Sequence, residues 1–226
     1  MNLIYFYDFE TSGFPLWSKP SGDPGQPHIV QCAAVMVETE SFKTVGDFCL
    51  IARPDGWDIP KEASDIHGIT TEFARDVGIA EASIMAILYD FHMRATTRIG
   101  HNQPFDARIM RIALKRFSHE GHADSWKAGE SYCTQKASTP IVKLPPTEKM
   151  LAAGRRGNKT CGLAEAYQHF MGKPMEDAHD AMADVLATMA VYWNLVEQKL
   201  TEGPQLAIQA RSSNGQGSGG DGVGFL

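Results

Sequence analysis

The chain has 226 residues, of which 43% are apolar and 21% charged, a size and composition typical of one compact globular domain. Its formal net charge of −6 excludes a protein that coats nucleic acid through bulk positive charge. No apolar run approaches the roughly 18 residues of a membrane span, and the four cysteines show no CxxC spacing. We therefore expect a cytoplasmic protein without membrane contact, disulfide framework or zinc knuckle.

The first half of the chain predicts strands and then alternating helix and strand. Runs rich in aliphatic and aromatic residues, bounded by Gly, Pro and Asp, predict three successive strands over Leu3–Asp8, Ile29–Val37 and Val45–Ala52. The pattern next predicts helix, strand and helix over Ala80–Ala95, Thr97–Gly100 and Pro104–Phe117. This order implies an α/β fold: a mixed central sheet, made of a three-strand meander followed by alternating helix and strand, flanked by helices.

The composition of the chain changes near residue 200. A short helix is predicted over Gly162–Met171, and a longer one from Asp180 to about Gln198, with an apolar stripe at spacings of three and four residues. From Gly203 onward Gly, Ser, Asn and Gln replace this periodicity. The sequence thus predicts a domain over 1–200 and a disordered Gly/Ser-rich tail over 201–226. The apolar tip of that tail, Val223–Leu226, would suit docking to a replication or repair partner.

Positive charge gathers in one stretch of an otherwise acidic chain. From Ile141 to Cys161 the net charge is +4, which leaves −10 elsewhere; the basic residues are Lys143, Lys149, Arg155, Arg156 and Lys159. Such segregation attracts a polyanion locally, although a solvated basic loop has the same composition.

Two carboxylates stand at the end of the first predicted strand. Asp8 and Glu10 stand two residues apart, so on a regular strand both side chains project to the same side. Carboxylates placed in this way can share a hard cation, and charges next to an apolar run are costly without a counter-ion. A strand that simply ends in solvent would show the same residues.

Further acids occur at the predicted starts of two helices. Asp106 ends the stretch His-Asn-Gln-Pro-Phe-Asp, in which Asn102 or Gln103 can cap the helix. Near the last helix, His179 and Asp184 could not face one centre if both lay mid-helix, because five residues rotate through about 140°. Asp180 is a natural N-cap, which would put His179 just before the helix. Taken singly, these acids would also suit helix-dipole compensation.

Three motifs in this order resemble those of the DEDDh (DnaQ-like) 3′→5′ exonuclease family. The motifs are Tyr-Asp-Phe-Glu-Thr at 7–11, His-Asn-Gln-Pro-Phe-Asp at 101–106 and His-Asp-Ala-Met-Ala-Asp at 179–184. A fourth family-like element is Ile-His-Gly-Ile-Thr at 66–70, and the last motif is most similar to that of the exonuclease I nuclease domain. The resemblance covers about residues 1–198 and implies a ribonuclease H-like fold.

By this resemblance, the chain would remove nucleotides from a free 3′ end, with single-stranded DNA preferred, and release nucleoside 5′-monophosphates. Asp8, Glu10, Asp106 and Asp184 would hold two divalent cations, Mg²⁺ or Mn²⁺, which hard oxygen ligands suit. His179 would be the general base, since an imidazole titrates close to neutral pH.

The resemblance also assigns substrate-binding residues. Thr11 would meet the terminal sugar, Asn102 and Phe105 would shape the pocket, and His67 would sit near the terminal base. The loop over Phe14–His28 is longer than in the compact proofreading subunits, and its Phe14 and Trp17 could stack on bases.

Other functions remain open on sequence grounds. An RNA-trimming exoribonuclease of the same family differs only in contacts to a 2′ position, which motifs do not reveal. A non-catalytic binding module of the replisome could keep the same fold, although all five catalytic positions are filled. A DxDxT phosphohydrolase is disfavoured, because Glu10 stands where that scheme needs its second aspartate.

Overall fold

The computed structural model describes residues 2–176 and 178–213, without the side chains of residues 120 and 198–213. Six strands form one mixed sheet in the order β4-β3-β2-β1-β5-β6. Their bounds are β1 Leu3–Thr11, β2 Ile29–Glu38, β3 Thr44–Arg53, β4 Ile79–Ala80, β5 Thr97–Gly100 and β6 Ser131–Cys133. β2 runs antiparallel to both β1 and β3, whereas β1, β5 and β6 are parallel to one another and β4 is parallel to β3. The predicted meander, followed by alternating helix and strand, is confirmed.

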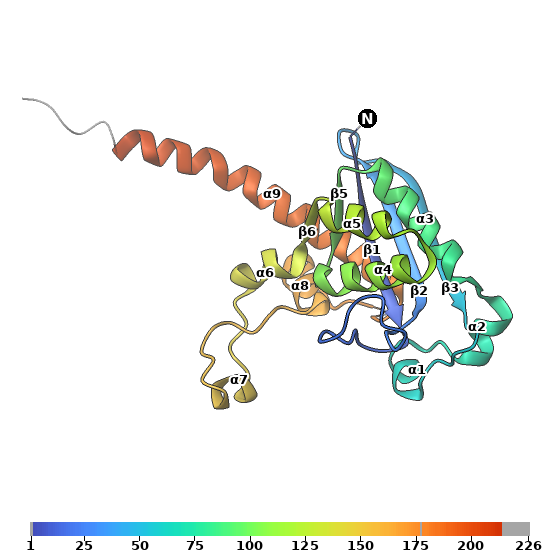
Figure 1. Cartoon of the computed structure of the whole chain (residues 1–226). Helices are drawn as coiled ribbons and strands as arrows, with labels where there is room; N and C mark the ends of the chain where they lie inside the picture. The colour runs from blue at the N-terminus through green and yellow to red at the C-terminus, as the bar shows by residue number, and fades with distance from the viewer. Residues whose placement is uncertain (1, 177, 214–226) are drawn as a thin grey trace, which may run out of the picture.

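The described helices cover both faces of this sheet (Figure 1). Their bounds are α1 Lys61–His67, α2 Thr71–Val77, α3 Glu81–Arg94, α4 Gln103–Phe117, α5 Glu120–Ala128, α6 Thr134–Val142, α7 Glu148–Ala152, α8 Leu163–Met171 and α9 Ala181–Ser213. One core joins β1 and β2 to α3, α4 and α5, with Trp126 fully buried in it. A second core joins the opposite face of the sheet to α9. None of the helices in the described ranges is long and apolar enough to cross a membrane.

The C-terminal helix differs from the prediction. α9 continues to Ser213 instead of ending near Gln198, and so passes through Gly203 and Pro204. Both residue types have low helix propensity, which is why the pattern predicted an earlier end. Residues 201–213 of the expected tail are therefore helical in the structure, whereas the rest of that tail, with the predicted docking tip Val223–Leu226, lies outside the described residues.

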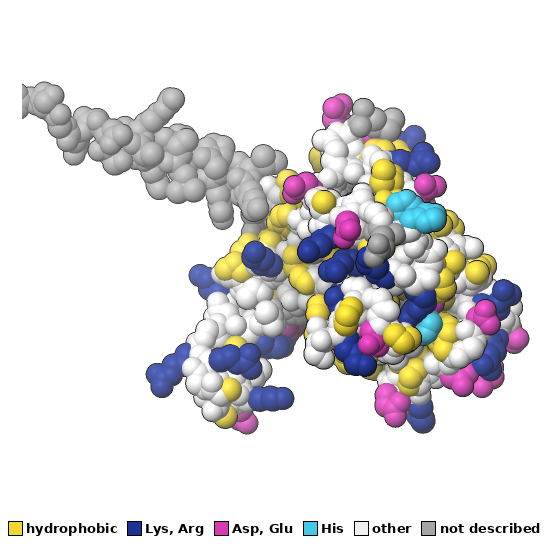
Figure 2. Space-filling model, viewed as in Figure 1, with side chains coloured by type: hydrophobic (Ala, Val, Ile, Leu, Met, Phe, Trp, Pro, Cys, Tyr) yellow, Lys and Arg dark blue, Asp and Glu magenta, His cyan; other side chains and the backbone are white. Residues whose placement is uncertain are grey.

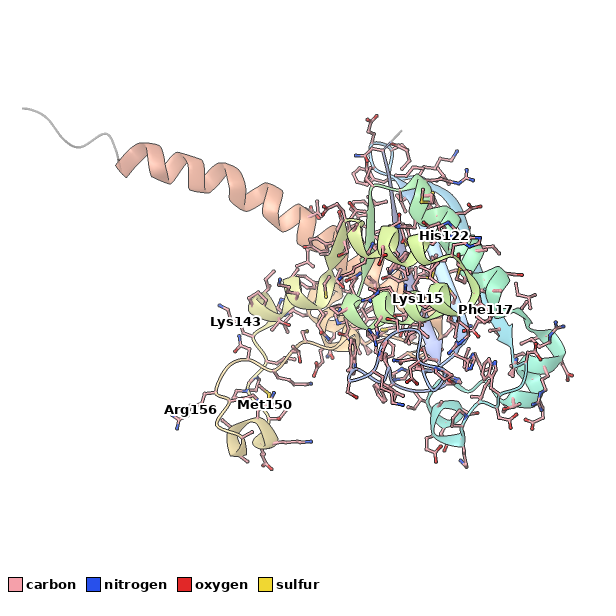
Figure 3. The ribbon with its side chains drawn as sticks, in the orientation of Figure 1. Lys115, Phe117, His122, Lys143, Met150 and Arg156 are labelled. Carbon is pink, nitrogen blue, oxygen red and sulfur yellow. The ribbon has the colours of Figure 1, made fainter. Side chains whose placement is uncertain are left out.

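The basic stretch found in the sequence forms a projection between α6 and α8. Figure 1 shows this segment extending from the body with α7 near its end. Basic side chains are visible along it in Figure 2. Figure 3 places Lys143 near its start and Arg156 near Met150, which belongs to α7.

Candidate active site

The geometry of β1 sets the direction of the first two acids. Side chains alternate across a strand, and Ile4 and Phe6 pack in the core that contains α9, whereas Tyr5 packs on the opposite face. Asp8 and Glu10 continue the series of Ile4 and Phe6, so both carboxylates lie on the same side of β1, as predicted, and this side faces α9. Regular pairing with β2 shifts register just after Glu10, as is common beside active sites.

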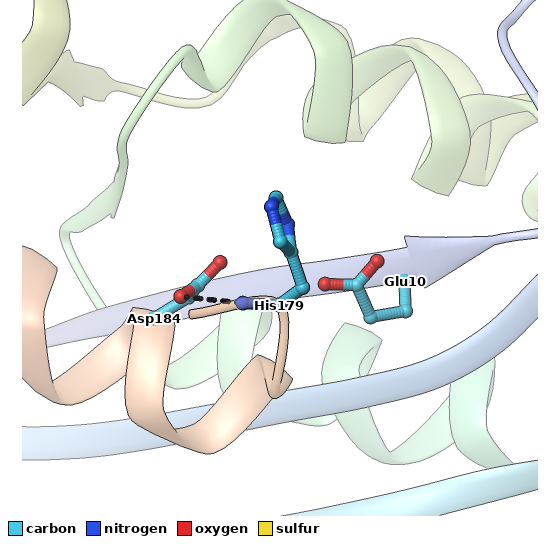
Figure 4. Close-up of side chains that lie close together, drawn as sticks. All are labelled: Glu10, His179 and Asp184. Carbon is cyan, nitrogen blue, oxygen red and sulfur yellow. Dashed lines mark hydrogen bonds between the residues drawn. The ribbon is translucent and has the colours of Figure 1, made fainter. Parts of the chain in front are cut away.

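The N-terminus of α9 brings the third motif to the same place. Asp180 caps the helix, because its Oδ1 accepts hydrogen bonds from Met182 N at 3.1 Å and Ala183 N at 3.0 Å. His179 precedes the helix with a left-handed φ of 72°, and its backbone N–H donates to Asp184 Oδ1 at 3.4 Å (Figure 4). His179 and Asp184 can therefore face one centre, which the N-cap position of Asp180 predicted.

Sequence reasoning missed Gln31, which holds this N-terminus in place. Gln31 lies on β2 opposite Glu10 and is buried. Its Oε1 accepts from Ala181 N at 3.1 Å, and its Nε2 donates to Asp180 Oδ2 at 3.3 Å. One polar residue within the apolar run Ile-Val-Gln-Cys-Ala was the available signal, since a buried amide needs hydrogen-bond partners.

The acids and the imidazole converge. Ligand atoms of Glu10, His179 and Asp184 all lie within 4.8 Å of one another, and Figure 4 shows the three side chains gathered at the end of β1 and the start of α9. Asp106, in the first turn of α4, is only 2% exposed and interacts electrostatically with Glu10 and Asp184. Asp8 interacts with the other three acids. Glu10, His179 and Asp184 thus form one cluster, and Asp8 and Asp106 interact with its acids.

Burial and mutual repulsion raise the pKa of every acid in the cluster. Burial is the largest cause for Asp8, whose pKa lies well above its usual range, followed by repulsion from Asp106 and Asp184. Burial, then Asp184 and Asp180, raise the pKa of Glu10 to about 8. Burial also raises the pKa of Asp106, although backbone N–H groups partly oppose it, and that of Asp184, which His179 partly lowers.

This electrostatic state fits a cation site. Close, partly desolvated carboxylates repel one another, and a divalent cation between them would remove both the repulsion and the cost of burying their charge. The donor set consists of carboxylate oxygens with one imidazole, which suits Mg²⁺ or Mn²⁺ better than metals that prefer thiolates. The four cysteines are free, and none belongs to the cluster of possible ligands.

A pocket of about 330 Å³ opens beside the cluster. Glu10 and His179 lie on its wall together with the predicted Thr11, His67 and Phe105; its other lining residues include Phe9, Phe14, Ala63 and Ile66. Asn102 does not line this pocket: it is the exposed N-cap of α4 in a left-handed conformation, without the side-chain capping bond that the sequence suggested.

His67 contributes a neutral imidazole to the pocket. Ile69 N–H donates to His67 Nδ1 at 3.1 Å, which places the ring proton on Nε2. Burial lowers the pKa of His67. The ring is therefore uncharged at neutral pH, and its Nε2 atom is buried.

The long loop after β1 folds around a buried glutamine. Gln26 Nε2 donates to Leu16 O at 3.1 Å and Pro20 O at 2.9 Å, and its Oε1 accepts from Leu16 N at 2.9 Å. The loop presents Phe14, 80% exposed, edge-on to Phe105 with 6.0 Å between ring centroids. Trp17 is 60% exposed. Stacking of these aromatic rings on bases stays a prediction.

Known proteins resemble this chain along most of its length. A model of the family described as RNase_T, exonuclease, matches residues 5–192. Exodeoxyribonuclease I of Escherichia coli K12 is 27% identical over 206 residues, covering 84% of this chain and 39% of that protein. The Haemophilus influenzae enzyme of the same name is 27% identical over 207 residues, covering 87% and 40%. The chain thus spans about two-fifths of the length of the curated relatives it matches.

Solved structures agree on the fold. Exonuclease I of Escherichia coli, in complex with a dT13 oligonucleotide, superposes with a TM-score of 0.67 at 24% identity, covering 92% of this chain and 43% of that one. A moderately thermophilic exonuclease I from Methylocaldum szegediense gives 0.64 at 26% identity, covering 88% and 41%. The ribonuclease H-like fold implied by the motifs is confirmed. Because a model of this family matches residues 5–192, this chain belongs to the DEDDh exonuclease family.

Proposed function

We propose that this chain is a 3′→5′ exonuclease that hydrolyses the terminal phosphodiester of single-stranded DNA and releases nucleoside 5′-monophosphates. The observation that carries the proposal is the juxtaposition of Glu10, His179 and Asp184, within 4.8 Å of one another, with a pocket large enough for one nucleotide. The preference for DNA rests on the relatives named exodeoxyribonuclease I.

Asp8, Glu10 and Asp184 would hold two divalent cations, Mg²⁺ or Mn²⁺, with Asp106 supporting the second cation or its waters. When bound, these cations supply Lewis acidity for the attacking water and neutralise charge on the phosphate. The raised pKa values of the acids support this assignment, since a cation would stabilise their ionised forms.

His179 would take the proton of the attacking water at a ring nitrogen. The side chain is exposed at the mouth of the cluster, and its backbone is tied to Asp184. An imidazole held there can pass the proton on to solvent. This role predicts that His179 acts on the rate of hydrolysis and contributes little to binding.

The pocket would hold the terminal nucleotide through its apolar and polar walls. Phe105 and Ile66 offer apolar contact to the base, and the neutral ring of His67 forms part of the same wall. Thr11 Oγ1 donates to Gly13 O at 2.8 Å, so this hydroxyl would meet the sugar as an acceptor. A pocket of about 330 Å³ is at the lower end of the size range for ligand sites.

The first test is hydrolysis of a 5′-labelled single-stranded DNA oligonucleotide with Mg²⁺ or Mn²⁺. We expect a ladder that shortens from the 3′ end, complete loss with EDTA, and no ladder from the Asp184→Asn variant. Matched RNA and double-stranded substrates identify the preferred nucleic acid. Faster degradation of RNA would move the assignment to an exoribonuclease, and oligonucleotide binding without hydrolysis under either metal would favour a binding module.

The second test addresses His179. We expect His179→Ala to lower kcat by about 10²–10⁴-fold, the usual contribution of a general base, with KM changed by less than about threefold. Exposed His169 provides a control, because His169→Ala removes a histidine of α8 that is absent from the pocket lining. Equal losses in rate and affinity for His179→Ala would contradict the general-base role.

A further inference from the structure

The segment between α6 and α8 forms an ordered basic arm, defined here as residues 143–160. At its base, Lys159 N donates to Leu144 O at 3.1 Å, and Leu144 packs in the core shared by α6, α8 and α9. Further out, Thr147 Oγ1 caps α7 by accepting from Met150 N at 3.2 Å, and Arg155 N donates to Met150 O at 2.8 Å. The arm therefore has a defined shape, although α7 buries none of its side chains.

Four positive charges on this arm are available to a partner molecule. Lys143, Lys149, Arg155 and Arg156 are exposed, and no ion pair joins them to any side chain in the described ranges. Lys159 differs, because it pairs with Glu165 of α8 and so helps fix the arm to the body. The remaining cations concentrate positive charge on a chain whose net charge is −6, as the basic side chains on the projection in Figure 2 illustrate.

The C-terminal end of the arm is hydrogen-bonded to the segment that precedes α4. Cys161, directly after the arm, accepts a hydrogen bond through its carbonyl from His101 Nε2 at 2.9 Å, and His101 Nδ1 lies 3.0 Å from Thr134 Oγ1. His101 is buried and immediately precedes Asn102, the N-cap of the helix that carries Asp106. Burial lowers the pKa of His101 to about 4, so the neutral ring makes these two bonds at physiological pH.

The arm and the active site lie toward the same side of the molecule. In Figure 1 the arm extends on the side where β1 ends, which is also the side of α1 and of the loop that follows β1. Glu10 at the end of β1 and Ala63 and Ile66 of α1 line the pocket. A polymer whose end occupies the pocket can therefore run toward the arm without crossing the sheet.

We propose that the basic arm is a second contact for single-stranded nucleic acid, which binds the phosphates of nucleotides upstream of the one in the pocket. The inference rests on the proposed function and adds a substrate track to it. Residues 143–160 contain no aromatic side chain, so the arm lacks the stacking platform that usually holds bases. Contact through Lys and Arg alone is salt-dependent and indifferent to base identity.

The arm would make the enzyme favour longer strands. A substrate of about four nucleotides fills the pocket and little more, whereas one of about 30 nucleotides exceeds the length that one single-strand site usually covers. Loss of arm contacts should therefore weaken binding of the long strand and leave hydrolysis of the short one unchanged.

The test compares two variants that each lose two positive charges. Arg155→Ala/Arg156→Ala removes charge from the arm, and Lys43→Ala/Arg94→Ala removes the same charge from two exposed positions, one after β2 and one in the last turn of α3. Binding of fluorescent dT and dA strands of about 30 nucleotides is measured against KCl concentration, with Ca²⁺ in place of Mg²⁺. Hydrolysis of short and long strands is measured with Mg²⁺.

For the arm variant we expect about tenfold weaker binding of both long strands and a salt slope smaller by about 1.4, or 0.7 for each lost phosphate contact. The KM for the long strand should rise in step, kcat on the short strand should stay unchanged, and the control variant should behave as wild type. Lys143→Gln/Lys149→Gln should give the same result, which guards against a local folding defect in the first variant.

Several outcomes would overturn the arm's role. Equal weakening in arm and control variants would show that net charge alone matters. Unchanged binding in the arm variants, or no binding by the wild type, would mean a solvated loop or a site for an acidic protein. Slower hydrolysis of the short strand would place the arm in the catalytic site. A wild-type protein that binds long strands through the arm but hydrolyses none would keep this inference and refute the proposed function.

Discussion

The substitution Glu10→Gln should reveal how the raised pKa of Glu10 affects the stability of the metal-free protein. The amide matches the carboxylate in shape but carries no charge, and the pKa of Glu10 rises from 4.5 to about 8 on folding. Below pH 4.5 the carboxyl is protonated in both folded and unfolded chains, so the variant and wild type should be equally stable. As the pH rises toward 8, the unfolded chain releases this proton first, so the stability of the wild type declines more than that of the variant, in which, of the four acids, only Asp8, Asp106 and Asp184 still titrate with raised pKa values.

The size of the effect follows from the same pKa. Each pKa unit corresponds to about 1.4 kcal/mol, which sets an upper limit of about 5 kcal/mol for Glu10 at high pH. The side chain is half-buried, and solvent screening reduces that figure. We therefore expect Glu10→Gln to be more stable than wild type by about 2 kcal/mol at pH 8, or about 4–8 °C in Tm for a chain of this length.

Thermal unfolding in EDTA at acidic, neutral and mildly alkaline pH measures this difference. Glu40→Gln, an exposed acid in the turn after β2, serves as the control and should match wild type throughout. Adding Mn²⁺ should raise the Tm of the wild type more than that of Glu10→Gln, because a ligand stabilises only the state that binds it. A Glu10→Gln variant no more stable than wild type at pH 8 in EDTA would refute the repulsion argument.

Other substitutions test residues that support the local structure of the domain. Asp180→Ala removes the N-cap of α9 and should cost about 1 kcal/mol in unfolding free energy, with a lower kcat that Asp180→Asn largely restores. Gln31→Ala leaves the buried Ala181 N–H unpaired and should cost about 1–3 kcal/mol in denaturant titrations. Gly78→Ala would place Cβ 2.3 Å from Ala74 O and should cost about 1–3 kcal/mol, whereas Gly121→Ala, with nothing within 4 Å, should stabilise α5 slightly.

Features encoded within a few residues could be predicted from the sequence. The two-residue spacing of Asp8 and Glu10 puts both side chains on the same side of β1, because the period of a strand is two. Asp180 identifies the start of α9 by its capping preference, and a helix that starts there leaves His179 in the preceding loop. The order of strands and main helices followed from similar local patterns.

Features that depend on distant pairing could not be predicted. Gln31 acts on α9 only because β2 pairs with β1 in a register that sets it opposite Glu10. α1 and α7 are short helices without a single buried residue, so no apolar periodicity marks them. α6 contains Pro140, which in sequence reads as a helix breaker.

The spacing between Glu10 and Asp184 depends on the packing between the sheet and α9. Val185 is fully buried in the core that holds Ile4 and Phe6, and its neighbour Asp184 faces the end of the same strand. The depth at which Val185 packs therefore sets the separation between Asp184 and Glu10. Because close-packed cores resist small displacements, the apolar contacts beneath the acids oppose the repulsion that would otherwise move these carboxylates apart.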